Sequence, residues 1–187
     1  ALGELVKQGK VRQIGLSNET PWGTMKYLEL AETKSLPRVA SIQNAYNLVN
    51  RGFEIGLSEV AMHEQVGLLA YSPLAQGTLT GKYLGGQMPQ GSRLALFGDG
   101  PLMMRYKGDK TQQAIEMYVN LAKKYEIDPA QLAIQFCNIQ PFVTSTIIGA
   151  TTMEQLKTCI DSVDLDITKE IINEIRSIHK EIPNPAP

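Results

Sequence analysis

The fold is decided by a strand–helix–strand stretch in the first half of the chain, VASIQNAYNLVNRGFEIGLSEVAMHEQVGLLAY (residues 39–71). Residues 39–46 and 66–71 are short and β-rich, and a helical segment at 53–64 separates them. Strands that are apolar on both faces and alternate with helices are typical of a parallel sheet covered by helices. The stretch therefore predicts an α/β fold.

The same alternation continues on both sides of this stretch. Two further strands are expected at 11–17 and 144–148, which makes four, and no internal repeat lies beyond this alternation. Residues 72–107 carry seven glycines and three prolines and are expected to form one long loop, which in a compact domain is usually functional. The first residues are expected to be the last turns of a helix. Further helices are expected at 21–36, 111–125, 128–140 and 168–180, and another begins at residue 152. Asp128 and Thr152 are the expected caps of the helices that they begin.

Composition and charge exclude several classes of protein. The 187 residues carry 18 basic and 19 acidic side chains, so no excess of positive charge indicates a nucleic-acid partner. No apolar run approaches the roughly 20 residues that span a bilayer, and the first residues do not form a signal peptide. The 2 cysteines and 2 histidines are scattered, so no metal site is expected. We expect a single domain, residues 1–187, in the cytoplasm with no membrane contact.

Polar or aromatic side chains stand where each expected strand ends. Ser17 and Asn18 follow the first strand, Gln43 lies at the end of the second, and Tyr71 ends the third. The fourth is followed by a helix start at residues 149–152. In α/β folds, ligands bind at the carboxyl ends of strands. Amides and hydroxyls satisfy a carboxamide, an aromatic face suits a planar ring, and a helix start suits a phosphate.

Two cations, Lys82 and Arg93, lie in the long loop and would add contacts to an anion. The set therefore predicts a nucleotide that carries an amide-bearing ring. Each residue also has a purely structural interpretation: Ser17 and Asn18 suit a cap or turn, and Gln43 and Tyr71 suit interior positions. Thr152 suits a helix cap, and loop cations are usually solvated. The recurrence at successive strand ends favours the ligand site.

Four stretches resemble the aldo-keto reductases, a family of (β/α)8 TIM barrels that use NADP(H). They are GLSNET (15–20), SIQNAYNLVNR (41–51), LLAYSPLAQGTLTGKY (68–83) and STIIGATTMEQLK (145–157). The resemblance runs through essentially all of the chain and is closest to the Tas-like branch, near the potassium-channel β-subunits. It implies an α/β fold, a TIM barrel of which about the C-terminal half is present, with four parallel strands and their helices.

The resemblance also implies roles at the nicotinamide and pyrophosphate. Ser17, Asn18 and Gln43 would hold the carboxamide, and Tyr71 would stack on the nicotinamide ring. The residues that would line the pyrophosphate are Ser72, Pro73, Leu74, Ala75 and Gln76, with Lys82 and Arg93 in the loop that folds over the cofactor.

The other end of the cofactor would lie after the last strand. Gly149, Ala150 and Thr151 would sit at the 2′-phosphate and ribose, and Gln155, Thr158 and Cys159 near the adenine. Gln155, Thr158 and Cys159 depart from the family pattern. Many members have Arg at the position of Gln155 and Glu-Asn at the positions of Thr158 and Cys159. The departure predicts weaker adenine contacts and leaves the preference for NADP over NAD open.

The family's catalytic Asp, Tyr, Lys and His belong to the first half of the barrel, and none can be assigned in this chain. The resemblance implies an NADP(H)-dependent oxidoreductase that reduces small aldehydes or ketones to alcohols, with this chain inactive alone. Its open strand edges would need the N-terminal half of the barrel or a second chain. Two alternatives stay open: a non-catalytic NADP(H)-binding regulatory module, and a half-barrel that self-associates. Residues 97–106, with Met103 and Met104, either line the substrate pocket or form a lid that packs on itself.

Overall fold

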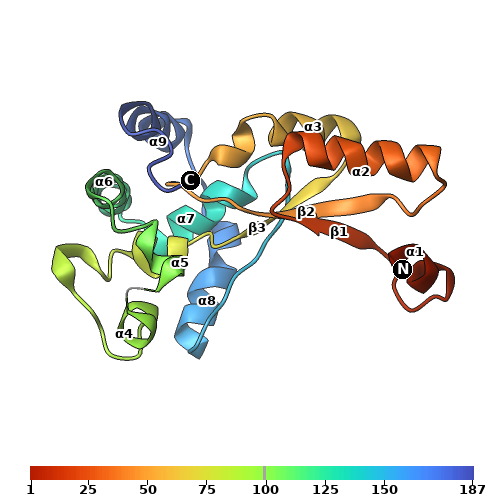
Figure 1. The fold of residues 1–187 in the computed structure, drawn as a ribbon. Helices are drawn as coiled ribbons and strands as arrows, with labels where there is room; N and C mark the ends of the chain where they lie inside the picture. Colours follow the sequence, from red (N-terminus) through yellow and green to blue (C-terminus); the bar gives the residue numbers. More distant parts are fainter. Residues whose placement is uncertain (99) are drawn as a thin grey trace.

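The computed structural model describes residues 1–98 and 100–187, and its centre is a parallel sheet of four strands (Figure 1). Neighbours in the chain are neighbours in the sheet, in the order β1-β2-β3-β4. A parallel sheet with sequential strand order is the arrangement of a TIM barrel before closure. The strands are β1 (Ile14–Ser17), β2 (Val39–Ala45), β3 (Gly67–Tyr71) and β4 (Val143–Thr146).

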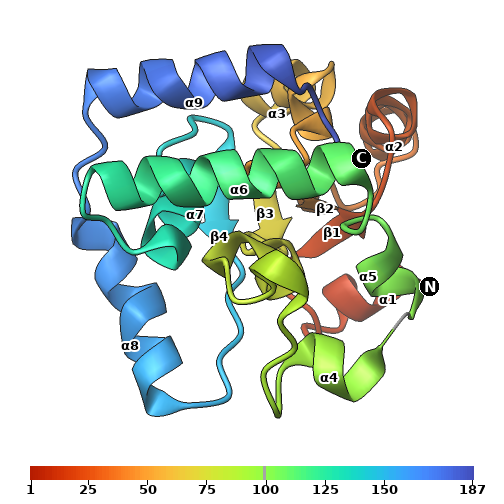
Figure 2. The same cartoon turned by 90° about the vertical axis from the view of Figure 1, so that its left-hand side faces the viewer.

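Helices follow each strand, as the sequence predicted. The long helices α6 and α9 pack against each other and lie side by side in Figure 2. The main helices are α1 (Leu2–Lys7), α2 (Pro21–Thr33), α3 (Leu57–Glu64), α6 (Asp109–Lys124), α7 (Pro129–Asn138), α8 (Met153–Asp161) and α9 (Lys169–Glu181). A short 3-10 turn, η4 (Ser162–Asp164), follows α8.

The predicted helix starts at Asp128 and Thr152 are confirmed. The Asp128 side chain accepts hydrogen bonds from the backbone N–H groups of Ala130 and Gln131, at 2.7 and 3.2 Å. Thr152 accepts from the N–H of Gln155 at 3.2 Å. These side chains satisfy N–H groups that have no partner inside the helix.

Two expected elements are wrong in detail. The expected helix at 53–64 is divided into a 3-10 turn, η1 (Gly52–Glu54), and α3, because Gly56 has a left-handed φ of 88°. The segment 72–107 is not one loop. It contains short helical elements separated by glycines with positive φ: η2 (Ala75–Thr80), η3 (Leu84–Gly86), α4 (Arg93–Phe97) and α5 (Pro101–Met104).

The two faces of the sheet differ, which corrects the expectation of strands apolar on both faces. Ile42, Leu68 and Ala70 are fully buried in the core against the helices. The opposite face carries small or polar side chains in register: Gly15 lies beside Ser41, and Ser17 beside Gln43. β1 alternates between half-buried and exposed residues, and in β4 two exposed residues lie between two half-buried ones. The short apolar runs did not distinguish a two-sided core from a sheet with one polar face.

Candidate functional site

The carboxyl ends of β1, β2 and β3 bring four of the predicted residues together. Ser17 pairs with Gln43 in the sheet, and the backbone N–H of Asn18 donates to the Gln43 carbonyl at 2.9 Å. The Tyr71 hydroxyl donates to Asn18 Oδ1 at 2.9 Å. The hydroxyl, the two amides and the phenol therefore lie on one edge of the sheet, and the Asn18–Tyr71 bond links the ends of β1 and β3 across β2.

A tight turn at residues 72–76 continues from Tyr71. Ser72, Ala75 and Gln76 have left-handed φ angles of 55°, 48° and 60°. Non-glycine residues adopt this conformation only where the surroundings impose it, and such strain concentrates at ligand sites. The Ser72 carbonyl accepts from the N–H of Ala75 at 2.9 Å, and Gln76 Nε2 donates to Ser72 Oγ at 3.0 Å. Pro73 and Ala75 are buried and Leu74 is half-buried, which anchors the turn.

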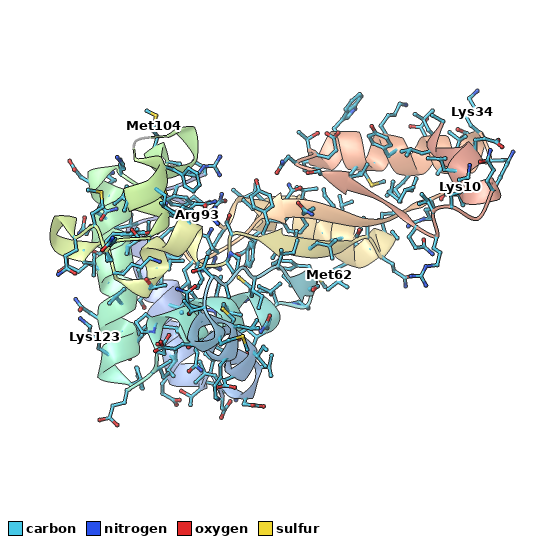
Figure 3. All side chains as sticks on the ribbon, turned by 90° about the horizontal axis from the view of Figure 1, so that it is seen from below. Lys10, Lys34, Met62, Arg93, Met104 and Lys123 are labelled. Atoms are coloured by element: carbon cyan, nitrogen blue, oxygen red, sulfur yellow. The ribbon has the colours of Figure 1, made fainter. Side chains whose placement is uncertain are left out.

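Both predicted cations lie against this turn. Arg93 Nη1 donates to Gln76 Oε1 at 2.6 Å, which places α4 beside the turn. The Lys82 ammonium lies over the Tyr83 ring, 5.2 Å from its centroid, and a Cβ added to Gly77 would be 3.1 Å from the Lys82 nitrogen. Figure 3 shows Arg93 at the end of the molecule opposite Lys10 and Lys34. Two positive charges beside a strained turn suit a phosphate group.

The predicted adenine and 2′-phosphate residues lie around the start of α8. Gly149, Ala150 and Thr151 are exposed. Gln155 Oε1 accepts from the Thr151 N–H at 3.0 Å and from its hydroxyl at 3.1 Å, so the reciprocal bond of the capping box falls one residue before Thr152. The Gln155 side chain is therefore engaged by its own helix start.

Thr158 and Cys159 are less accessible. The Thr158 side chain is half-buried, and its carbonyl accepts from Gln131 Nε2 at 3.4 Å. Cys159 is 5% exposed, and burial, with a further contribution from the Asp128 charge, raises the pKa of its thiol. A ligand contact from the Cys159 side chain would require α8 to move.

The segment 97–106, predicted either to line a substrate pocket or to form a lid that packs on itself, holds one buried and one exposed methionine. Met103 is 3% exposed, whereas Met104 is 64% exposed. Residue 99 lies outside the described residues. The burial of Met103 fits a segment that packs partly on itself.

Sequence reasoning assigned no role to a buried polar cluster behind the site. The Tyr46 hydroxyl donates to Glu54 Oε1 at 2.7 Å, and Arg51 donates to both Glu54 oxygens at 2.6 and 2.8 Å. Burial alone would raise the pKa of Glu54, but the hydrogen bonds from Arg51 and Tyr46 lower it below its ordinary value. The spacing Arg51–Glu54 is an ion-pair signal that the sequence carries, yet it gives no sign of burial.

These features define the class of protein: a parallel α/β domain with amides, a hydroxyl and a phenol at its strand ends and two cations in the segment that follows β3. Within the described ranges, no three His, Cys, Asp or Glu side chains gather as metal ligands. No helix in the described part of the chain is long and apolar enough to cross a membrane.

Comparison with known proteins identifies the family. The Aldo/keto reductase family matches residues 1–180, and the chain belongs to it. Over 187 residues, all of the chain and 53% of the relative, it is 51% identical to Protein tas of Escherichia coli (strain K12). It is 33% identical over 167 residues (88% of the chain, 48% of the relative) to L-glyceraldehyde 3-phosphate reductase from the same strain. It is 35% identical over 120 residues (63% of the chain, 37% of the relative) to a probable voltage-gated potassium channel subunit beta of Oryza sativa subsp. japonica.

The chain spans about half the length of the curated relatives that it matches. Its family consists of NAD(P)-dependent oxidoreductases that typically use NADP(H) and have the TIM-barrel fold. The four-stranded sheet is thus about half of such a barrel.

Proposed function

We propose that this chain is the cofactor-binding half of an oxidoreductase that reduces aldehydes or ketones to alcohols with NADPH. The observation that carries the proposal is the convergence of Ser17, Asn18, Gln43 and Tyr71 on one edge of the sheet, through the Asn18–Gln43 and Tyr71–Asn18 bonds. Two amides and a hydroxyl match the donors and acceptors of a carboxamide, and the phenol offers a flat face to its ring.

The residues present fit the rest of the cofactor as well. The strained turn at 72–76 and its two cations suit the pyrophosphate, and the exposed residues 149–151 suit the ribose and 2′-phosphate. When bound, NADPH would supply the hydride for the carbonyl carbon. The chain's own residues would hold the nicotinamide in place, with the Tyr71 phenol oriented by its hydrogen bond to Asn18.

The proton donor and the cover of the sheet would come from the rest of the barrel. β1 and β4 are the edge strands of the described sheet and each pairs with one neighbour in it. Unpaired strand edges favour association with further strands. We place the family's Asp, Tyr, Lys and His on that other half and the small carbonyl substrate between the two halves. We place the protein in the cytoplasm, where its two free cysteines would stay reduced.

The test is a fluorescence titration of the natural gene product with NADPH. Tyr71→Ala is expected to raise the dissociation constant about fivefold to tenfold, which is the usual worth of one aromatic stack. Tyr27→Ala is the matched control, because Tyr27 is a 51% exposed tyrosine of α2 and none of the predicted cofactor contacts involves it. A natural protein that binds no NADPH, or equal effects of the two variants, would overturn the proposal.

Turnover is tested separately with a panel of small aldehydes and ketones. Oxidation of NADPH by any of them supports the reductase. Tight NADPH binding without turnover across the panel would favour the non-catalytic regulatory module.

A further inference from the structure

Asn47 is a fully buried polar residue directly behind the candidate site, 0% exposed, in the turn that follows β2. Its Oδ1 accepts hydrogen bonds from the N–H groups of Val49 at 3.0 Å and Asn50 at 2.9 Å. These two donors fix the orientation of the amide, because the flipped amide would set its own N–H groups against them. The side-chain nitrogen must therefore point away from the turn.

That nitrogen points at the Ser72 carbonyl. Asn47 Nδ2 donates to Ser72 O at 3.0 Å, across 25 residues of sequence. Ser72 has a φ of 55° and stands before Pro73, where steric contact with the proline ring favours an extended backbone instead. The conformation is therefore costly, and the Asn47 bond is a contact from outside the turn that opposes its relaxation.

The effect of this bond reaches the cations. Ser72 Oγ accepts from Gln76 Nε2 at 3.0 Å, and Gln76 Oε1 accepts from Arg93 at 2.6 Å. A series of hydrogen bonds thus runs from Asn47 to the Ser72 backbone, and from the Ser72 side chain through Gln76 to the guanidinium of Arg93 in α4. If Ser72 leaves its left-handed conformation, its hydroxyl and the contact with Gln76 are displaced as well.

The turn that carries Asn47 is held from the other side by the C-terminal segment, residues 182–187. The N–H of Ala186 donates to the Val49 carbonyl at 3.1 Å, and Asn184 Oδ1 accepts from the N–H of Arg51 at 2.7 Å. The Tyr106 phenol also lies at Asn47: burial raises the pKa of Tyr106, and hydrogen bonding to Asn47 partly offsets that rise. Backbone support for the turn on one side and a side-chain donor directed at the Ser72 carbonyl on the other are the features of a positioning group.

We propose that Asn47 is a positioning residue of the cofactor site, which fixes the Ser72 carbonyl and so holds the 72–76 turn in the shape that binds the cofactor pyrophosphate. This inference rests on the proposed NADPH-binding function. Asn47 does not touch the cofactor and acts through Ser72.

The first test compares Asn47→Asp with Asn50→Asp in the natural gene product, by titration with NADPH. Aspartate keeps the acceptor for Val49 and Asn50 but removes the donor to Ser72 O, so the dissociation constant should rise about tenfold or more. Asn50 is the matched control: it is 6% exposed in the same turn, and its Oδ1 accepts from Gly52 instead of reaching Ser72. Its variant should bind NADPH within about twofold of the natural protein.

A purely structural role would reduce the folded fraction without changing the dissociation constant of the molecules that remain folded. Equal dissociation constants for the two variants would therefore overturn the proposal. If the buried carboxylate prevents Asn47→Asp from folding, Asn47→Ser takes its place, since serine is neutral and smaller. Asn47→Ser should also weaken NADPH binding.

Amide hydrogen exchange without NADPH gives a readout that does not depend on the proposed function. The N–H of Ala75 is bonded to Ser72 O, so its protection should fall about tenfold in Asn47→Asp and stay unchanged in Asn50→Asp. Unchanged protection in Asn47→Asp would overturn the positioning role. A natural protein that binds no NADPH would refute the proposed function, and the exchange result would still decide whether Asn47 holds the turn.

Discussion

Replacing Arg51 by alanine is expected to destabilise the protein far more than removing a comparable surface cation. Arg51 donates to both oxygens of Glu54, and its guanidinium lies 5.3 Å from the centroid of the Phe136 ring. The side chains of Arg51 and Glu54 are only 13% and 28% exposed. The truncation removes two charge-assisted donors and leaves the carboxylate in a site where water reaches it poorly.

The expected loss is about 3 to 4 kcal/mol in the free energy of unfolding. Breaking a buried ion pair by removing one partner costs about 3 to 5 kcal/mol, and the partial exposure of Glu54 places this pair at the low end. The contact with Phe136 adds roughly 0.5 to 1 kcal/mol. The pKa of Glu54 lies below its ordinary value of 4.5, so the natural protein loses this pair's stabilisation as the pH falls through and below that value. Arg51→Ala should lack that part of the acid dependence.

The assay is urea unfolding of the natural gene product at neutral pH, with Lys26→Ala as control. Lys26 and Glu29 have the same spacing of three residues and a 2.7 Å contact, but their side chains are 45% and 56% exposed. An exposed pair contributes less than about 1 kcal/mol, so the control should change stability by about 0.5 kcal/mol or less. A loss below about 1 kcal/mol for Arg51→Ala, or equal losses in the two variants, would refute the argument from burial.

Other predictions concern the pH dependence, the sheet and a helix cap. Burial and the Arg51 charge lower the pKa of His179 below 6.5, so just below pH 6.5 the unfolded chain binds more protons than the folded protein. The stability, measured as the urea midpoint, should therefore rise with pH in this range, and His179→Gln should flatten that rise. Gly67→Ala should lower the free energy of unfolding by about 1 to 3 kcal/mol in the same assay, because the new Cβ would be 1.8 Å from Thr144 Oγ1. Gly149→Ala is the control and should leave the stability nearly unchanged, because a Cβ there would have no neighbour within 4 Å. Asp128→Ala should cost about 1 kcal/mol by removing the cap of α7, and an unchanged melting temperature would contradict this.

Local sequence patterns predicted most of the secondary structure. The apolar runs located all four strands, and Asp128 and Thr152 marked the starts of α7 and α8. These signals are local, because a cap bonds within three residues and a strand is recognised from its own side chains. The same reasoning failed over residues 72–107, where the short helical elements are set by glycine conformations and by contacts with the rest of the fold.

The sequence by itself determined the class of fold, the family and the residue types at the strand ends. Only the tertiary structure decided which of them meet: Tyr71 bonds to Asn18 across 53 residues, and Cys159 is buried away from the surface of α8. Only the tertiary structure also showed that Asn47 reaches Ser72 and that Arg51 and Glu54 are half-buried. The reason is physical, since burial and long-range hydrogen bonds depend on how the sheet and helices pack, whereas helix starts and strand runs depend on neighbours in the chain.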